Sequence, residues 1–327
     1  MKKLLPSIVL CCFVLSSCEK AKEIANKTRA TVEDQIAKQT SGSDDVATDS
    51  ELQKLVDQTP EGVIFRKDLP LPSQFEVKIT RRSEVSNRAI FRSAIESNSS
   101  VTKGTLLHVS KLERSGDQVR YTLEQSTFAE PVIEGSDESK TPAPKILEPP
   151  SKPSIFQKTG TTWKAETTEG FRAITLAKQL SPVFDVLLVD NAVSPRPMWF
   201  PKARVKIGQE FNLNDEALPM LIAGNAKGNL KVKLKSIETV KGHPCGVFEI
   251  TGDYSRKKIP DFSGALTSED VTIQAGQIWL SLIYPLILKE ELDVIQSTQM
   301  DRQSGVDSRT QGAAKVSVVR EWKKTAP

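Results

Sequence analysis

The sequence predicts a mainly β protein of the α+β class: an antiparallel meander, of a kind that can curl into a half-barrel, with a few short helices and an N-terminal helical tether. Three observations lead to this prediction. Apolar and polar residues alternate in many segments, most clearly over Leu230–Ile237, where the lysines lie on one face. Turn sequences such as Ser115-Gly116-Asp117 separate neighbouring segments, as in hairpins. Segments with helical spacing are short, and no tandem repeat is present.

Residues 1–17 have the layout of a secretory signal peptide. Two lysines follow Met1, an apolar run covers Leu4–Phe13, and small residues precede Cys18. The apolar run is shorter than the roughly 20 residues that a membrane-spanning helix needs. The segment Leu15-Ser16-Ser17-Cys18 resembles the lipobox of bacterial lipoproteins. This resemblance implies cleavage before Cys18 and acylation of its thiol, so that lipid holds the body to a membrane.

The same resemblance implies an exported protein of the cell envelope with a periplasmic body. Glu19 stands where an Asp favours inner-membrane retention in enterobacterial lipoproteins, so the outer membrane is favoured over the inner one. The alternative is an ordinary secretory signal in which Cys18 is incidental. Residues 18–49 are predicted to form a polar tether, with a weak helical stripe followed by a flexible linker rich in Ser, Gly and Asp.

Residues 50–133 are predicted to be an N-terminal β-rich part. Ser50-Glu51-Leu52-Gln53 matches a capping box, which predicts a short helix from Ser50 to about Gln58. Thr59-Pro60 is expected to end this helix. Strand patterns follow at Phe75–Thr80, Ala89–Ile95, Thr105–Lys111 and Val119–Leu123, although Ala89–Ile95 also suits a short helix.

Residues 134–154 interrupt these patterns with acidic residues, serines and five prolines. This segment is predicted to be either a linker between two domains or a long exposed loop within one. Residues 155–327 are a C-terminal β-rich part, with helices expected at Leu176–Leu188 and Asn214–Ile222. A short strand and turn are expected at Val205–Phe211. Strands are expected at Leu230–Ile237, Cys245–Gly252, Val271–Ala275, Gln277–Ile283, Leu286–Ser297 and Lys315–Trp322.

The charge balance argues against partners that need a strong electrostatic field. The formal net charge is +4, from 45 basic and 41 acidic residues. Removal of Lys2 and Lys3 with the signal leaves 43 basic against 41 acidic residues, or +2. Neither nucleic acid binding nor cation buffering is therefore expected.

No catalytic, cofactor-binding or metal-binding motif is recognisable in the sequence. Only two histidines are present, and HExxH, CxxC, P-loop and G-x-S-x-G patterns are missing. Cys245 is the one thiol left after signal removal and acylation, and its place beside His243 at a turn favours a buried structural role over a catalytic pair. Glu290 and Glu291 are expected to point to opposite faces of a strand. No enzyme activity is predicted, although a hydrolase with dispersed carboxylates stays an alternative.

The tryptophans divide into two kinds. Trp279 and Trp322 lie in strand patterns and are expected in the core. Met198-Trp199-Phe200 lies between prolines, and this trio is the candidate contact for a partner if it is exposed.

Two functions fit these features. The first is a non-enzymatic envelope lipoprotein that acts as a binding or scaffolding module, with the membrane as partner through lipid on Cys18 and a protein or an amphiphile as the second partner. The second is a carrier of lipid or another amphiphile in a groove of the curved sheet. A lipid-anchored curved sheet is similar in architecture to the half-barrel lipoproteins of the lipoprotein-sorting and lipid-transport group. That likeness predicts a continuous apolar concavity lined by inward positions of the strands from Asn229 onward.

Overall fold

The computed structural model divides the chain into two compact units, Met1–Gly42 and Ser43–Pro327. The residues that it describes all lie in the second unit. Cys18, the tether, the helix expected at Leu176–Leu188 and the trio Met198-Trp199-Phe200 lie outside the described residues. The described residues are 50–65, 73–92, 97–133, 144–148, 152–159, 162–167, 203–215, 218, 226–260, 266–284, 286–301 and 307–325.

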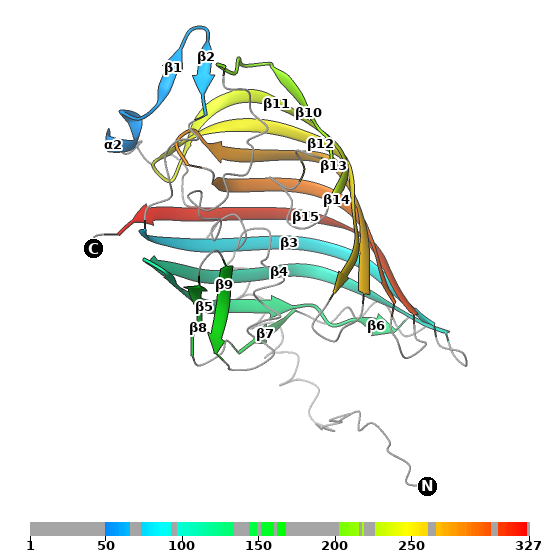
Figure 1. Ribbon diagram of the computed structural model, residues 1–327. Coiled ribbons are helices and arrows are strands. Elements are labelled where there is room, and N and C mark those ends of the chain that lie inside the picture. Colours follow the sequence, from blue (N-terminus) through cyan, green and yellow to red (C-terminus); the bar gives the residue numbers. More distant parts are fainter. Residues whose placement is uncertain are drawn as a thin grey trace, which may run out of the picture. The chain divides into compact units, whose positions relative to one another are not determined.

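Most of the described residues belong to an antiparallel β-sheet, as their alternating pattern predicts (Figure 1). A short helix, α2 (Ser50–Gln53), comes first, and β1 (Asp57–Thr59) and β2 (Gly62–Ile64) form a separate two-stranded sheet. The strands of the large sheet are β3 Gln74–Arg92, β4 Ser97–Ser115, β5 Gln118–Phe128, β6 Val132–Ile133, β7 Lys145–Leu147, β8 Ser154–Thr159, β9 Thr162–Thr167, β10 Glu210–Leu213, β11 Lys227–Val240, β12 His243–Pro260, β13 Leu266–Ser281, β14 Ile287–Asp301 and β15 Asp307–Lys324.

The large sheet is open and curved, which confirms the predicted fold class. It runs in the order β10-β11-β12-β13-β14-β15-β3-β4-β5-β8-β9, with β6 paired to β4 and β7 to β5. Its long strands bend together (Figure 1), and no pairing between described residues joins β10 to β9. β15 pairs with β3 from Asp307↔Arg92 to Lys324↔Phe75, so strands from both sides of the Pro-rich segment share one sheet. Among the described residues, no helix has the length and apolarity needed to cross a bilayer.

One strand is much longer than the sequence pattern predicts. Phe75–Thr80 and the described part of Ala89–Ile95 both belong to the 19-residue strand β3. Between them, Arg81, Ser83 and Asn87 occupy positions on the same face as the apolar residues Val77 and Ile79. The alternation that signals a strand is therefore lost in the middle of β3, although the strand continues. The predicted strands Val271–Ala275 and Gln277–Ile283 merge in the same way into β13.

The helix predicted to reach Gln58 stops at the end of α2, so the extension is wrong. The residues that follow form the β1–β2 hairpin, because Pro60 turns the chain and the two strands satisfy each other's backbone groups. At the second expected helix, Asn214–Ile222, the Leu218 N–H donates to the Asn214 carbonyl at 2.9 Å, which is the i→i−4 spacing of an α-helix; the other residues of this segment except Asp215 lie outside the described residues.

Two hairpin turns adopt the backbone that their sequences predict. Gly116 has φ of 60° between β4 and β5. Lys241 and Gly242 have φ of 48° and 83° between β11 and β12. Positive φ at both central residues is characteristic of the type I′ turn that matches the twist of a hairpin. The β4–β5 and β11–β12 hairpins are therefore closed by turns that the local sequence favours.

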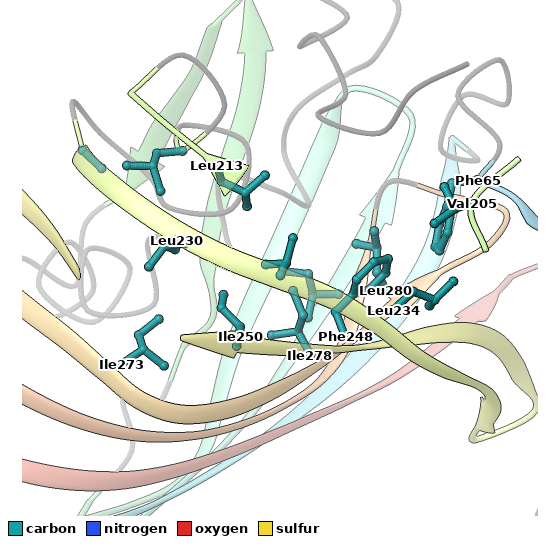
Figure 2. Packing of buried hydrophobic residues seen from close by; sticks show 14 of the residues in the cluster. Phe65, Val205, Leu213, Leu230, Leu234, Phe248, Ile250, Ile273, Ile278 and Leu280 are labelled. Carbon is teal, nitrogen blue, oxygen red and sulfur yellow. The ribbon is translucent and has the colours of Figure 1, made fainter. Parts of the chain in front are cut away.

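One face of the large sheet is apolar. Leu234, Phe248 and Ile278 lie opposite one another on β11, β12 and β13, and we call the face to which these side chains point the apolar face. Phe65 and Val205, from outside the large sheet, belong to the same buried cluster (Figure 2). Each fully buried aliphatic or aromatic side chain contributes about 1.5–3 kcal/mol relative to exposure, so this cluster holds the β1–β2 hairpin and the segment around Val205 to the sheet.

The opposite face, which we call the charged face, carries ion pairs between strands. Glu76 contacts Lys111 Nζ at 2.7 Å and Lys323 Nζ at 3.0 Å, and Lys78 contacts Glu124 at 3.8 Å. The hydrogen bond from Lys111 is the main cause of a lowered pKa at Glu76. Solvent-exposed pairs contribute only about 0.2–1 kcal/mol each. These ion pairs therefore favour the observed cross-strand register, and they add little to the stability of the fold.

The predicted core tryptophans are both buried. Trp322, Val77, Leu112 and Tyr121 form one row across β15, β3, β4 and β5. Trp279 belongs to the same buried cluster. Burial of aromatic side chains at one end of the long strands gives β3, β4 and β5 a second core, distinct from the cluster around Phe248.

Candidate functional site

A row of polar side chains crosses the apolar face at the middle of the long strands. In register, Glu290 on β14 lies opposite Val318 on β15, which lies opposite Arg81 on β3. Arg81 in turn lies opposite His108 on β4, and His108 opposite Ser126 on β5. Two more polar residues lie two positions further along β15 and β3, on the same face. We call the group the polar belt: Glu290, Arg320, Arg81, Ser83, His108 and Ser126.

Arg320 is the most buried ion of the polar belt, with a side chain only 5% exposed. Its guanidinium donates to the Ile287 carbonyl at 3.1 Å and to Glu290 Oε2 at 3.2 Å. A buried charge is tolerated when it is both paired and hydrogen-bonded. Arg320 therefore has a structural role, since it ties β15 to β14 from within the apolar face.

Among the described residues, Arg81 has no such carboxylate partner. Its Nε donates to Ser83 Oγ at 3.3 Å, and no carboxylate of the described residues lies within ion-pair distance of its guanidinium. Burial lowers the pKa of Arg81, the nearby charge of Glu290 opposes that shift, and Arg320 adds to it. An arginine stays protonated in proteins, so Arg81 is a desolvated cation on an apolar face.

His108 is held neutral next to this cation. Its Nδ1 lies 2.6 Å from the hydroxyl oxygen of Ser126, which is buried. Burial lowers the pKa of His108, and the positive charge of Arg81 lowers it further. With His108 neutral, two positive charges on Arg81 and Arg320 face one negative charge on Glu290. The polar belt thus carries a net charge of +1.

The apolar face beside the polar belt is partly exposed. The next row in register contains Leu292, Val316, Ser83 and Leu106, of which the three apolar residues are half-buried. Val85, one row further along β3, is half-buried as well. We call Leu292, Val316 and Leu106 the aliphatic row. A polar belt and an aliphatic row therefore lie side by side on a single face of the sheet.

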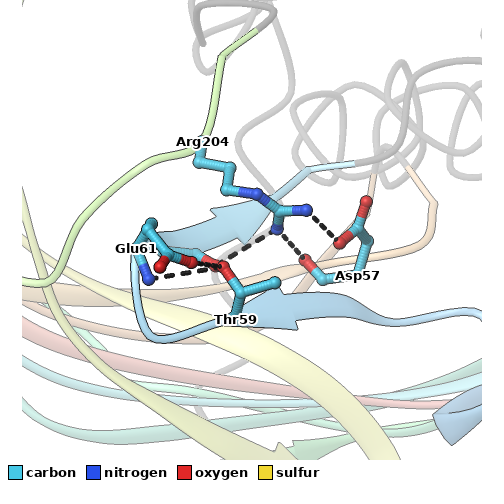
Figure 3. Close-up of polar contacts among 5 residues, drawn as sticks. Asp57, Thr59, Glu61 and Arg204 are labelled. Carbon is cyan, nitrogen blue, oxygen red and sulfur yellow. Dashed lines mark hydrogen bonds and ion pairs between the residues drawn. The ribbon is translucent and has the colours of Figure 1, made fainter.

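A different part of the apolar face is covered by the chain itself. Val63 and Val205 exchange backbone hydrogen bonds of 3.0 and 2.8 Å, which join β2 to the segment before β10. Arg204 strengthens this junction (Figure 3): it donates to the Asp57 carboxylate at 2.6 Å, to the Asp57 carbonyl at 3.3 Å and to the Gly62 carbonyl at 3.4 Å. We call this junction the Arg204 clasp.

The Arg204 clasp places an aromatic ring over β12. Phe65, just after β2, packs on Phe248 with 5.4 Å between ring centroids and 45° between the ring planes. A Cβ at Gly246 would come within 2.5 Å of the Phe65 ring, so only glycine admits the ring there. The apolar groove expected from Asn229 onward is therefore filled over β11–β13 by the chain's own residues. The partly exposed apolar surface lies instead at β14, β15, β3 and β4.

The cysteine and histidine that are close in sequence form a structural contact. Cys245 Sγ donates to the backbone carbonyl of His243 at 3.4 Å, and burial raises the pKa of the thiol. His243 Nε2 lies 2.6 Å from Ser281 Oγ, which already accepts the N–H groups of Ile283 and Tyr284 at 3.0 Å each. Ser281 must therefore donate its proton to His243. Both residues are almost completely buried, and together they close the connection from β13 to β14.

A shallow depression of about 600 Å³ lies across β11–β15, away from the polar belt. One register row of the charged face contributes Lys227, Ser255, Asp270, Ser297 and Gln311. Thr272 Oγ1 donates to Asp253 Oδ1 within it, at 2.5 Å. The lining mixes polar and apolar residues of several strands, and Lys227, Asp253 and Asp270 are its charged members.

Two sequence expectations about carboxylates and metals can be compared with the structure. Glu290 faces Arg320 on the apolar face, whereas Glu291 contacts Lys289 at 3.3 Å, so the two acids point apart as expected. Within the described parts of the chain, no three His, Cys, Asp or Glu side chains gather closely enough to hold a metal ion.

Arg81, His108 and Ser126 cannot be recognised as a group from the sequence. Their one sequence signal is a polar residue at a position where an alternating strand should be apolar. That signal is weak within a single strand, because a break in the alternation also marks a strand end. The five strands of the row come together only through register, which long-range pairing decides.

Fold and site together define a class of protein: an open antiparallel sheet that keeps ionisable groups on its apolar face. No protein-family model and no curated protein matches the chain. Among solved structures, the chain is similar to lipovitellin, in a structure titled for its lipid–protein interactions, with 9% identity and a TM-score of 0.35. That match covers 79% of this chain and 26% of the lipovitellin chain, so this chain spans about a quarter of lipovitellin.

A DUF1329 family protein from Desulfovibrio piger is similar at 8% identity and a TM-score of 0.15, over 71% of this chain and 83% of that one. Superpositions as loose as these two establish neither a shared fold nor a shared function.

Proposed function

We propose that this chain is a non-enzymatic, membrane-tethered carrier that holds an amphiphile against the apolar face of its sheet. The observation that supports it is the partly exposed aliphatic row beside the polar belt. A molecule with an apolar body and a polar end matches such a surface, because each part meets groups of its own kind.

The energetic cost of the polar belt adds support. Burial of ionisable groups is unfavourable, and well-packed apolar residues of similar volume are often equally stable or more stable in their place. A sheet that served only as a packed core would gain nothing from a cation such as Arg81 on its apolar face. A ligand-binding sheet gains a polar contact there.

The N-terminus would give the carrier its location. In this proposal Cys18 is acylated, two or three acyl chains hold the protein to a membrane, and the tether lets the body stand away from the bilayer. An outer-membrane position follows from Glu19 after the cysteine, by the enterobacterial rule. The body would then meet amphiphiles that leave or enter the membrane beside it.

A protein-binding or scaffolding module is the second candidate function. The Arg204 clasp favours it, because the apolar face over β11–β13 is already packed by Phe65 and Val205 and needs no ligand there. In this reading the aliphatic row would contact a protein partner. The two candidates differ in whether a small amphiphile binds with saturation.

An uncharged amphiphile tests the carrier proposal without involving the polar belt. The full chain, purified in a mild non-ionic detergent, is titrated with 1-hexadecanol and the adduct is counted by native mass spectrometry. Saturable binding of about one molecule per chain is expected. Val316→Glu should weaken it by about tenfold or more, since a charge would enter the aliphatic row.

Ser317→Glu is the matched control, because Ser317 is the next residue on β15 and points to the charged face. It should leave hexadecanol affinity within about twofold of the parent. Absence of any saturable adduct, or equal losses in the two variants, would contradict the carrier and favour the protein-binding module.

A further inference from the structure

We infer that the amphiphile is acidic, and that a singly charged oxyanion head, such as a carboxylate or a phosphodiester, binds at Arg81 while the apolar chain lies along the aliphatic row. This inference depends on the proposed carrier function and specifies its ligand class. It is derived from the charges, hydrogen bonds and register of the polar belt.

The charge of the polar belt determines the sign and the magnitude of the charge that a bound head group should carry. Arg320 is satisfied by Glu290 and the Ile287 carbonyl, so its charge is already balanced. Among the described residues Arg81 has no ion-pair partner, and Glu290, whose charge acts on it, already pairs with Arg320. One negative charge from a ligand would neutralise the polar belt. A cationic head would add repulsion, and a doubly charged phosphate monoester would exceed the charge available.

The hydrogen-bonding groups of the polar belt select an oxyanion. The guanidinium of Arg81 uses Nε on Ser83, which leaves its terminal N–H groups as donors for a planar acceptor. Arginine binds carboxylate and phosphate oxygens through paired N–H groups, and such charge-assisted bonds are about twice as strong as neutral ones. Neutral His108 with Ser126 lies in the neighbouring register position and provides further polar contact without opposing charge.

The aliphatic row distinguishes an amphiphile from a small free anion. Val316 and Leu106 flank Ser83 directly, one row away from Arg81 in the strand direction. Alternate residues on one face of a strand are about 6.8 Å apart, so a head at Arg81 would have the first methylene groups of its chain at Val316 and Leu106. An anion without a chain would make only the polar half of these contacts.

Three probes separate the contribution of the anionic head group from that of the apolar chain. Palmitate carries both the head and the chain, 1-hexadecanol carries the chain alone, and acetate carries the head alone. The full chain in non-ionic detergent is titrated with each probe by native mass spectrometry. Palmitate should bind at least about tenfold more tightly than hexadecanol, because one charge-assisted contact contributes about 1.5–3 kcal/mol. Acetate should show no saturable binding in the same range.

Substitution of Arg81 tests the assignment of the head group. Arg81→Gln should lower palmitate affinity by about tenfold or more and change hexadecanol affinity by less than about twofold. Arg82→Gln is the matched control: Arg82 is the adjacent residue, lies on the charged face and contacts Glu84 at 3.7 Å. It should leave both affinities unchanged. Arg81→Lys, which keeps the charge, should retain most of the palmitate preference.

The outcomes separate the inference from the proposed function. If palmitate and hexadecanol bind equally, the acidic ligand class is overturned and the carrier function stands. If Arg81→Gln and Arg82→Gln behave alike, the binding of the head group at Arg81 is overturned and the carrier function again stands. If neither probe binds with saturation, both are overturned. Should Arg81→Gln fail to fold, as judged by circular dichroism, the comparison of palmitate with hexadecanol on the parent chain still decides the question.

Discussion

The apolar face of the sheet contains two regions that differ in what lies over them. Over β11–β13, Leu234 and Phe248 are completely buried beneath Phe65 and Val205. Across β14, β15, β3 and β4, the same face carries the polar belt and half-buried aliphatic side chains. Both regions follow the same alternation along their strands. Alternation of apolar and polar residues along the strands gives the sheet an apolar face. Whether that face becomes buried core or stays available as a binding surface depends on whether another segment of the chain packs over it.

The largest effect should come from truncation in the covered region. Phe248→Ala should reduce the free energy of unfolding by about 3–5 kcal/mol, because the removed ring leaves a cavity beneath Phe65 that cannot collapse fully. Val316→Ala, in the partly exposed region, should cost about 1 kcal/mol or less. Urea denaturation followed by circular dichroism measures both. Equal losses would mean that the two regions are packed alike.

A smaller effect is expected where the covering layer touches the sheet. In Gly246→Ala, the new methyl group would meet the Phe65 ring at 2.5 Å and Leu234 Cδ1 at 3.2 Å. Overpacking of this kind costs about 1–3 kcal/mol. Phe65→Leu in the same chain should relieve part of that cost, and a double-mutant cycle measures the relief. If the losses of unfolding free energy in the two single variants simply add, the new methyl group does not clash with Phe65.

The Arg204 clasp should contribute less than the ring that it positions. Arg204→Ala removes the contacts to Asp57 and Gly62 and should destabilise by about 1 kcal/mol, since the ion pair is partly exposed. Hydrogen exchange should become faster at Val63 and Val205 and stay unchanged in β3 and β4. Faster exchange throughout the sheet would contradict a local role for the clasp.

The smallest effect should appear in the polar belt as a pH dependence. Burial lowers the pKa of His108 below the value of about 6.5 expected in the unfolded chain. Between the two pKa values the unfolded chain binds more protons, so stability rises with pH there and is lost as the pH falls below about 6.5. His108→Gln should flatten the unfolding free energy between about pH 7 and 5 relative to the parent. An unchanged slope would assign the acid sensitivity to other groups.

Much of the fold can be predicted from sequence because strand periodicity and turn chemistry are local. Leu230–Ile237 alternates cleanly and forms the centre of β11, and Ser115-Gly116-Asp117 turns the chain between β4 and β5. The middle of β3 could not be predicted, since Arg81, Ser83 and Asn87 break the alternation on the apolar face. Two of these residues, Arg81 and Ser83, which make the strand hard to recognise from sequence, also belong to the polar belt.

The sequence by itself determined the class of fold, the turns and the core tryptophans, because each depends on neighbours within a few residues. It also carries the predicted lipid anchor at Cys18, which is a local motif. Only the tertiary structure decided that β15 pairs with β3, that the Arg204 clasp covers β11–β13, and that Glu290, Arg81 and His108 share a row. Those outcomes depend on pairing between residues far apart in the chain, where the free energy of the whole sheet selects one register.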